Sequence, residues 1–264
     1  MRKFAYSLTS ETLNVPLLEV LSVEQLRKEM SWNDVSQIAP RLPRGWFELM
    51  GLAKQDRLDF FLEYWSSILA FENKEFPGIC RFFSLLETLE VYLCRTAQGP
   101  FDVKMLYIFQ EERCCFQGEP PLMDLDERSF PLLRDDHYRR FFSVHNGFSK
   151  LEDEGILSYR SLAKVQQKLR QQLVKLGYIY PENDCCSLGL FPFYGYEEPL
   201  TYQCFLLDPE ICGNFSSPSI IIGEQERDCF GIENLEVLQL KTGFFPSFLS
   251  WLEAYLHSEN VYDR

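Results

Sequence analysis

Apolar residues recur at steps of three and four in the first hundred positions, which predicts helices. One run extends over 46–71, with an expected irregularity at 51–56. The turn Phe76-Pro77-Gly78 ends it, and the same spacing returns over 79–94. Two packed helices are therefore expected, because aromatic stripes of this kind are typical of helix cores rather than of a cofactor site. The apolar positions are Phe47, Met50, Leu58, Phe61, Leu62, Trp65 and Leu69 in the first run, and Phe82, Phe83, Leu86, Leu89 and Leu93 in the second.

Two shorter helices are predicted before this pair from their capping signals. Ser22 is followed three residues later by Gln25, which is the spacing of a capping box. Ser31 is placed to cap a second helix that stops at Pro40.

A β-hairpin is predicted after these helices. Its strands are 103–109 and 114–117, on either side of a charged turn. The segment 118–134 is then rich in proline and acidic residues, which is typical of a domain boundary. We therefore divide the chain into a mainly helical N-terminal region with a hairpin, residues 1–124, and a second module, residues 125–264.

The second module alternates helices and strands. Asp135 and Asp136 begin a short aromatic helix that Asn146-Gly147 closes, and a longer amphipathic helix over 159–176 stops at Gly177. Four strands and a helix that Pro246 opens follow, and this order predicts an α+β fold with an antiparallel or mixed sheet backed by helices. The predicted strands are Leu188–Tyr196, Thr201–Leu207, Ser219–Ile222 and Leu235–Leu240.

Composition and charge narrow the classes of partner. The 264 residues are 46% hydrophobic and 25% charged, which is ordinary globular composition. With 26 Lys+Arg against 39 Asp+Glu the net charge is −13, a sign that repels phosphate backbones and anionic headgroups. Neither nucleic acid nor a membrane is an expected partner. From Leu176 to Arg264 only three basic residues stand against fourteen acidic ones, which suits either a basic protein partner or simple solvation.

The cysteines indicate a reducing compartment. Their count is odd and no C-x-x-C occurs, so neither a disulfide framework nor a zinc ribbon is predicted. We also expect no secretory signal and no membrane span, because the apolar runs are short and broken. The cytoplasm is the expected location, although a leaderless export route would leave the same pattern. The nine cysteines are Cys80, Cys94, Cys114, Cys115, Cys185, Cys186, Cys204, Cys212 and Cys229.

Catalytic motifs are missing from the sequence. There are three histidines, His137, His145 and His257, and none belongs to an H-E-x-x-H pattern. The sequence also contains no G-x-S-x-G, no G-x-x-x-x-G-K-[ST] and no G-x-G-x-x-G. No catalytic residue, metal ligand or cofactor is therefore predicted.

The competing interpretation is a hydrolase with a Cys/His or carboxylate site between the two halves. Cys186 and His145 are a conceivable nucleophile and base. Asp135-Asp136 and 152–154 are acidic runs that could hold a divalent ion, but such runs are also typical of helix starts and solvated loops. The basic face of helix 159–176 suits phosphate binding, a solvated outer face, or pairing with the acidic strands after it.

The order of elements in the second half resembles the SUKH superfamily, which includes the yeast cell-wall synthesis regulator and many bacterial immunity proteins. The likeness covers roughly residues 128–256. It implies a non-enzymatic α+β module that holds another protein on a sheet face or in a groove, as an immunity, inhibitor or adaptor protein. The residues that carry the likeness are 130–148 with its terminal Asn-Gly-Phe, Gly155-Ile156-Leu157 with the following helix, Leu190-Phe191-Pro192-Phe193, the strand 202–208 and Phe245–Leu252.

Two groups of residues are the predicted binding site. One is the turn Asn146, Gly147 and Phe148. The other is the tyrosines of the sheet, Tyr194, Tyr196 and Tyr202, which would anchor a partner if exposed. The alternative is that these tyrosines belong to the core.

Overall fold

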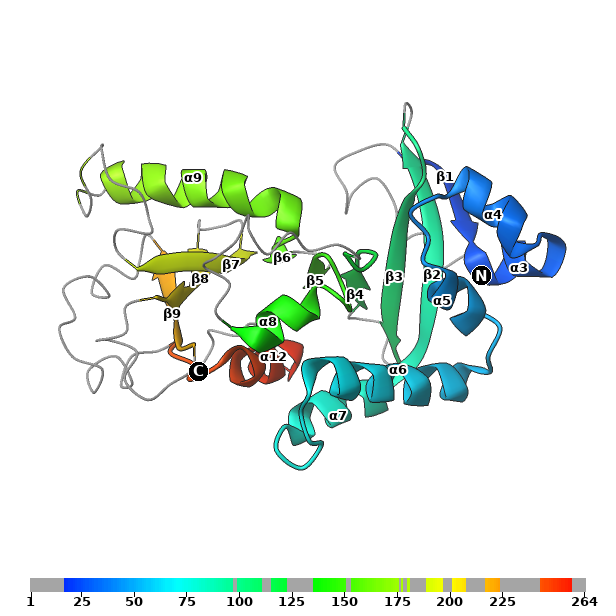
Figure 1. Cartoon of the computed structure of the whole chain (residues 1–264), viewed down its shortest axis with the longest axis horizontal. Coiled ribbons are helices and arrows are strands. Elements are labelled where there is room, and N and C mark those ends of the chain that lie inside the picture. The colour runs from blue at the N-terminus through cyan, green and yellow to red at the C-terminus, as the bar shows by residue number, and fades with distance from the viewer. Residues whose placement is uncertain are drawn as a thin grey trace.

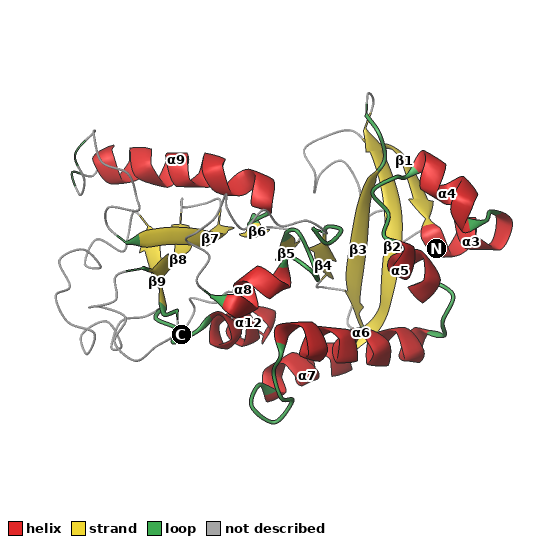
Figure 2. Ribbon diagram, in the orientation of Figure 1, coloured by secondary structure: helices red, strands yellow, loops and turns green. Residues whose placement is uncertain are grey.

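The computed structural model of the chain describes residues 17–96, 99–110, 115–122, 135–150, 153–175, 177, 180, 189–196, 201–207, 217–223 and 243–257. The predicted strand Leu235–Leu240, the proline turn at 130–134 and Cys186 lie outside these residues. Among the described residues, one antiparallel sheet of nine strands runs through the molecule in chain order. Figures 1 and 2 show β1 to β3 at one end of the long axis and β7 to β9 at the other.

Each strand pairs with the next one along the chain. The two halves meet where β4 pairs with β5, at Gly118 and Phe148. The strands are β1 (Leu17–Ser22), β2 (Leu86–Thr96), β3 (Asp102–Phe109), β4 (Cys115–Gly118), β5 (Phe148–Lys150), β6 (Gly155–Ile156), β7 (Leu190–Tyr196), β8 (Thr201–Leu206) and β9 (Ser219–Gly223).

The helices cover the sheet in groups. In Figure 1, α3 to α5 lie beside β1 and β2, while α9 lies above β7 and β8 and α8 and α12 lie below them. The helices are α3 (Val23–Glu29), α4 (Trp32–Ile38), α5 (Arg44–Leu49), α6 (Lys54–Leu69), α7 (Pro77–Ser84), α8 (Asp136–Phe141), α9 (Tyr159–Lys175) and α12 (Phe248–His257).

One apolar core extends across both halves, from Val23 to Leu256. At its centre the Trp65 ring of α6 lies 5.6 Å from Phe141 of α8 and 5.7 Å from Phe148 of β5. The α+β class is confirmed, and the sheet and the core continue past residue 124. The division into 1–124 and 125–264 stays a prediction, and the two halves share one sheet and one apolar core.

Several local predictions are confirmed. Ser31 caps α4 through a capping box with Asp34. The helical run interrupted near Gly51 is α5 followed by α6, and the hairpin is β3 paired with β4. The amphipathic helix is α9, and Gly177 has the left-handed φ of +77° that favours glycine after a helix.

Two N-terminal predictions are wrong. The short helix predicted after Ser22 is present as α3, but its capping box is not: the Ser22 side chain makes no capping bond, and the Ser22 backbone pairs with Tyr92 at the end of β1. The helix predicted through Cys94 ends at Ser84, and β2 follows it. The apolar steps of three and four suggested a helix, but Leu89, Val91 and Leu93 are buried while Glu90 and Tyr92 between them are half-buried. Burial of every second residue is the period of a strand. The N-terminal half thus contributes four strands to the sheet instead of two.

Candidate functional site

The predicted turn at Asn146 joins α9 to the middle of the sheet. Asn146 is buried, and its Oδ1 accepts a hydrogen bond of 2.8 Å from the Tyr159 N–H at the start of α9. Gly147 has a φ of +112°, and its carbonyl accepts from the Glu119 N–H at 2.9 Å. Phe148 then enters β5. The turn therefore positions the beginning of α9 over β4 and β5.

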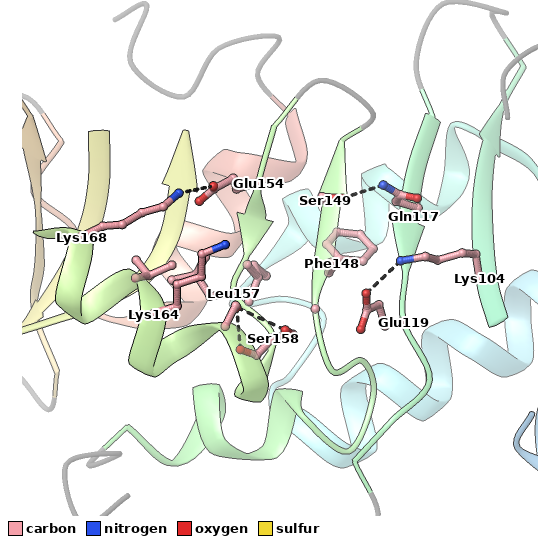
Figure 3. A pocket seen from close by; sticks show the side chains of 14 residues that line it. Lys104, Gln117, Glu119, Phe148, Ser149, Glu154, Leu157, Ser158, Lys164 and Lys168 are labelled. Atoms are coloured by element: carbon pink, nitrogen blue, oxygen red, sulfur yellow. Dashed lines mark hydrogen bonds and ion pairs between the residues drawn. The ribbon is translucent and has the colours of Figure 1, made fainter. Parts of the chain in front are cut away.

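A pocket of about 270 Å³ lies beside this turn. Figure 3 shows its side chains coming from β3, β4, β5, β6 and α9. Its apolar part is formed by Phe148, Ile156, Leu157 and Val165, and the rest of its lining is polar. The polar residues are Lys104, Gln117, Glu119, Ser149, Glu154, Ser158, Ser161, Lys164 and Lys168, and Gly147 completes the lining.

The charges of this pocket are mostly paired. Lys104 Nζ lies 2.9 Å from Glu119 Oε1, and Lys168 Nζ lies 3.3 Å from Glu154 Oε1. Lys164 extends between these pairs and has no ion pair among the described residues (Figure 3). The pocket therefore holds one uncompensated positive charge between two neutralised ones.

Small residues leave room for this arrangement. A Cβ at Gly195 of β7 would lie 2.7 Å from Glu154 Oε2, so a side chain there would displace the carboxylate that pairs with Lys168. Gly147 is also close to its surroundings, because a Cβ there would lie 3.3 Å from Ser158. Glycine at these positions keeps the pocket open.

One buried polar atom in the pocket is unpaired. Gln117 Nε2 donates to Ser149 Oγ at 3.1 Å. Gln117 Oε1 is buried and has no hydrogen-bond partner among the described residues. Turning the amide over would exchange the two atoms and leave its N–H group unpaired instead. Buried polar atoms are nearly always hydrogen-bonded in proteins, so this oxygen is an exception, and rotation of the amide toward the pocket would give it access to a partner.

The prediction of exposed tyrosine anchors is wrong for Tyr194 and Tyr202. Both are buried, and Tyr196 is half-buried. The Tyr194 ring lies 5.0 Å from that of Trp251 in α12. Burial, followed by the charge of Glu154, raises the pKa of Tyr202 to about 12. The core interpretation holds for these two residues, because helices lie on both sides of this part of the sheet.

Tyr194 belongs to a hydrogen-bonded cluster around Asp153. The Tyr194 and Tyr255 hydroxyls donate to Asp153 Oδ2 at 3.1 and 2.9 Å, and the Lys150 N–H donates to Oδ1 at 2.9 Å. Burial raises the pKa of Asp153 to about 6 even though all of these groups favour its ionised form. The cluster ties the β5–β6 connection to α12, and Asp153 does not line the pocket beside α9.

His145 is a core residue. It is fully buried; its Nδ1–H donates to the Glu119 carbonyl at 2.9 Å and its Nε2 accepts from the Tyr107 hydroxyl at 2.5 Å. Burial lowers the pKa of His145 to about 3, so the imidazole is neutral at physiological pH. Gly118 packs against the ring, and a Cβ there would lie 2.3 Å from it.

The geometry expected of a hydrolase is not found in the described part of the chain. His137 Nδ1 lies 3.8 Å from Asp135 Oδ1, beyond hydrogen-bond reach, and neither residue lines the pocket. No group of three His, Cys, Asp or Glu residues within the described ranges could hold a metal ion. The pair of His145 with Cys186 is untested because Cys186 lies outside those ranges.

A second concavity, of about 400 Å³, lies between α5 and α6. Phe60 and Leu52 project from it, with 54% and 41% of their surface exposed. We call this surface the α5–α6 groove. It is lined by Pro43, Gly45, Trp46, Glu48, Leu49, Leu52, Phe60, Phe61, Tyr64 and Pro121.

Acidic residues flank the groove. Asp56 and Glu63 are exposed and lie one turn before and one turn after Phe60 on the same face of α6, with exposed Asp59 beside them. None of the three has an ion pair among the described residues, whereas Glu48 is paired with Arg44 at 2.8 Å. This surface was not predicted from the sequence. Its signal was a phenylalanine outside the apolar stripe of α6, surrounded by acids.

Comparison with family models, curated proteins and solved structures found no match for this chain. Within the described ranges, no helix has both the length and the apolar character needed to cross a bilayer.

Proposed function

We propose that this protein is a non-enzymatic protein-binding module that acts as an immunity, inhibitor or adaptor protein. The observation that carries the proposal is Phe60, a large aromatic side chain that is 54% exposed at an apolar groove. Aromatic side chains in apolar pockets dominate the energetics of most protein interfaces. Completely burying a phenylalanine side chain contributes roughly 1.5–3 kcal/mol, so a partner that covers Phe60 gains binding free energy.

The charges around the groove favour a basic partner. Asp56, Asp59 and Glu63 present three carboxylates that no described cation neutralises. A partner segment with an apolar anchor flanked by lysine or arginine would satisfy both the groove and this row of acids. The same charges disfavour self-association, since a two-fold symmetric contact would bring identical acidic rows together.

The SUKH-like character of the C-terminal half is part of this proposal. The order α8, β5, β6, α9, β7, β8, β9 and α12 supports it. A cytoplasmic location is also proposed, and it is supported by the free thiols of Cys80 and Cys94.

Selection from a random peptide display library tests the binding function. We expect the wild-type protein to enrich peptides with a hydrophobic anchor next to lysine or arginine. Phe60→Ser should abolish their binding, and the double variant Asp56→Lys, Glu63→Lys should select a different, acidic consensus. Leu85→Ser is the matched control, because Leu85 is also an exposed apolar residue, at 43%, but does not line the groove.

The same variants then identify the full-length partner. Affinity purification from the source cells should recover a protein that contains the selected motif with wild type and with Leu85→Ser, and not with Phe60→Ser. Selected peptides that bind Phe60→Ser as well as wild type, or a consensus without basic residues, would overturn the proposal. Dimerisation through Phe60 in sedimentation experiments would replace it with a self-association surface.

A further inference from the structure

We infer that the pocket beside α9 binds a small monocarboxylic acid that also carries an amino or hydroxyl group, such as a free amino acid or hydroxy acid. This inference rests on the pocket alone and does not depend on the α5–α6 groove. Three features of the lining select a carboxylate, a hydrogen-bond donor and an apolar substituent.

Lys164 selects the carboxylate. The other two lysines of the pocket are neutralised by Glu119 and Glu154, so an anion gains most from Lys164. The lining as a whole carries three lysines and two glutamates, a net charge of +1. A ligand group with a single negative charge matches that net charge, whereas a phosphate monoester would exceed it.

Gln117 selects the donor. The amide of Gln117 keeps one buried polar atom unpaired, and while its Nε2 donates to Ser149 that atom is the acceptor Oε1. Rotation of the amide toward the pocket would let an ammonium or hydroxyl group on the ligand satisfy this acceptor. Glu119 and Glu154 are already paired with lysines, so Gln117 is the acceptor that the inference assigns to this donor.

The apolar floor and the volume limit the rest of the ligand. Phe148, Ile156, Leu157 and Val165 line the pocket and would contact an aliphatic or aromatic substituent. A volume of about 270 Å³ is at the lower end of ligand pockets, which accommodates a single amino acid rather than a nucleotide.

The test is a binding titration with free L-amino acids ranging in size from alanine to phenylalanine, by calorimetry and ligand-observed NMR. We expect saturable binding of at least one of them with a dissociation constant near or below about 1 mM. Two analogues of the best ligand isolate its groups: the deaminated acid lacks the donor, and the decarboxylated amine lacks the acid. Each should bind at least fivefold more weakly.

Variants locate the site. Lys164→Met should weaken binding of the amino acid roughly three- to tenfold, in keeping with an exposed ion pair. Gln117→Leu should weaken the amino acid but leave the affinity of the deaminated acid unchanged. Lys175→Met is the matched control, because Lys175 is exposed on the same helix and does not line the pocket.

Two results would overturn the inference. One is no saturable binding of any amino acid by a wild-type protein shown to be folded by its thermal transition. The other is binding that Lys164→Met and Lys175→Met affect equally. Neither result would bear on peptide binding at Phe60, so the two proposals fail separately.

Discussion

The α5–α6 groove and the pocket beside α9 are both concave, yet they are built in opposite ways. The groove is apolar and exposes Phe60, and Asp56, Asp59 and Glu63 beside it have no ion pair among the described residues. The pocket is largely polar, and four of its five charged residues neutralise one another, leaving Lys164. An apolar surface with a charged border suits a macromolecular partner, whereas a mostly neutralised polar pocket suits a small ligand that supplies the missing charge.

The largest expected effect concerns the support of the groove. Arg57 is buried, pairs with Glu24 at 2.8 Å and donates to the carbonyls of Leu89, Met50 and Leu52, of which Leu52 lines the groove. Arg57→Ala should lower the free energy of unfolding by about 2–4 kcal/mol, since it removes several charge-assisted hydrogen bonds to backbone carbonyls, while the partly exposed Glu24 keeps Lys28. Urea denaturation measures this. Lys54→Ala, which removes the exposed pair with Glu87, should cost less than about 1 kcal/mol. Equal losses of unfolding free energy in the two variants would contradict a structural role for the buried Arg57.

The next effect concerns the strands beneath the pocket and depends on pH. The pKa of Asp153 rises from 3.8 to about 6 on folding, so the folded state holds this proton more tightly than the unfolded state. The stabilisation from this group is complete below pH 4 and is lost as pH rises through 6, a change of roughly 3 kcal/mol at most.

Asp153→Asn should remove that loss. The variant keeps an acceptor for the tyrosine hydroxyls, so its stability should equal that of wild type near pH 4 and exceed it by about 1–3 kcal/mol at pH 7. Urea denaturation at both pH values measures the difference, and Glu154→Gln is the control for the neighbouring carboxylate. Parallel pH profiles of wild type and Asp153→Asn would contradict the burial of this carboxyl group.

Two glycines give a smaller and more direct contrast. Gly118, between two pocket residues, has no room for a methyl group because of the His145 ring, whereas a methyl group at Gly45 in the groove would have no atom within 4 Å. Gly118→Ala should cost about 1–3 kcal/mol through overpacking. Gly45→Ala, in α5, should be neutral or stabilise by up to about 1 kcal/mol. Thermal unfolding of both variants measures the difference. An equal loss of stability in the two variants would contradict the open space at Gly45.

The smallest expected effect is that of salt on the two sites. Peptide binding at the groove should weaken severalfold between roughly 0.05 and 0.5 M salt, because exposed charges are screened. The double variant Asp56→Asn, Glu63→Gln should reduce the salt dependence of peptide binding. It should leave the salt dependence of amino-acid binding at the pocket unchanged. A salt dependence unaltered by the double variant would mean that other charges hold the peptide.

The sequence alone determined those elements whose pattern is local. The amphipathic stripe of Leu162, Val165 and Leu169 predicted α9. The Ser31 cap predicted the start of α4, and the irregularity near Gly51 predicted the break between α5 and α6. It failed at β2, where the spacing of leucines fits both a helix and a strand. Burial against the helices, which no local period encodes, decided between them.

The sites were decided by the tertiary structure. Lys164 and Lys168 are alike on the basic face of α9, and only the approach of Glu154 from the β5–β6 connection neutralises one and leaves the other free. Tyr194 and Tyr202 are buried in strands that lie between α9 and α12 (Figure 1), whereas Phe60 of α6 remains 54% exposed. Exposure and charge pairing depend on contacts between residues distant in the chain, so the order of residues predicts the elements but not which of their faces remain available.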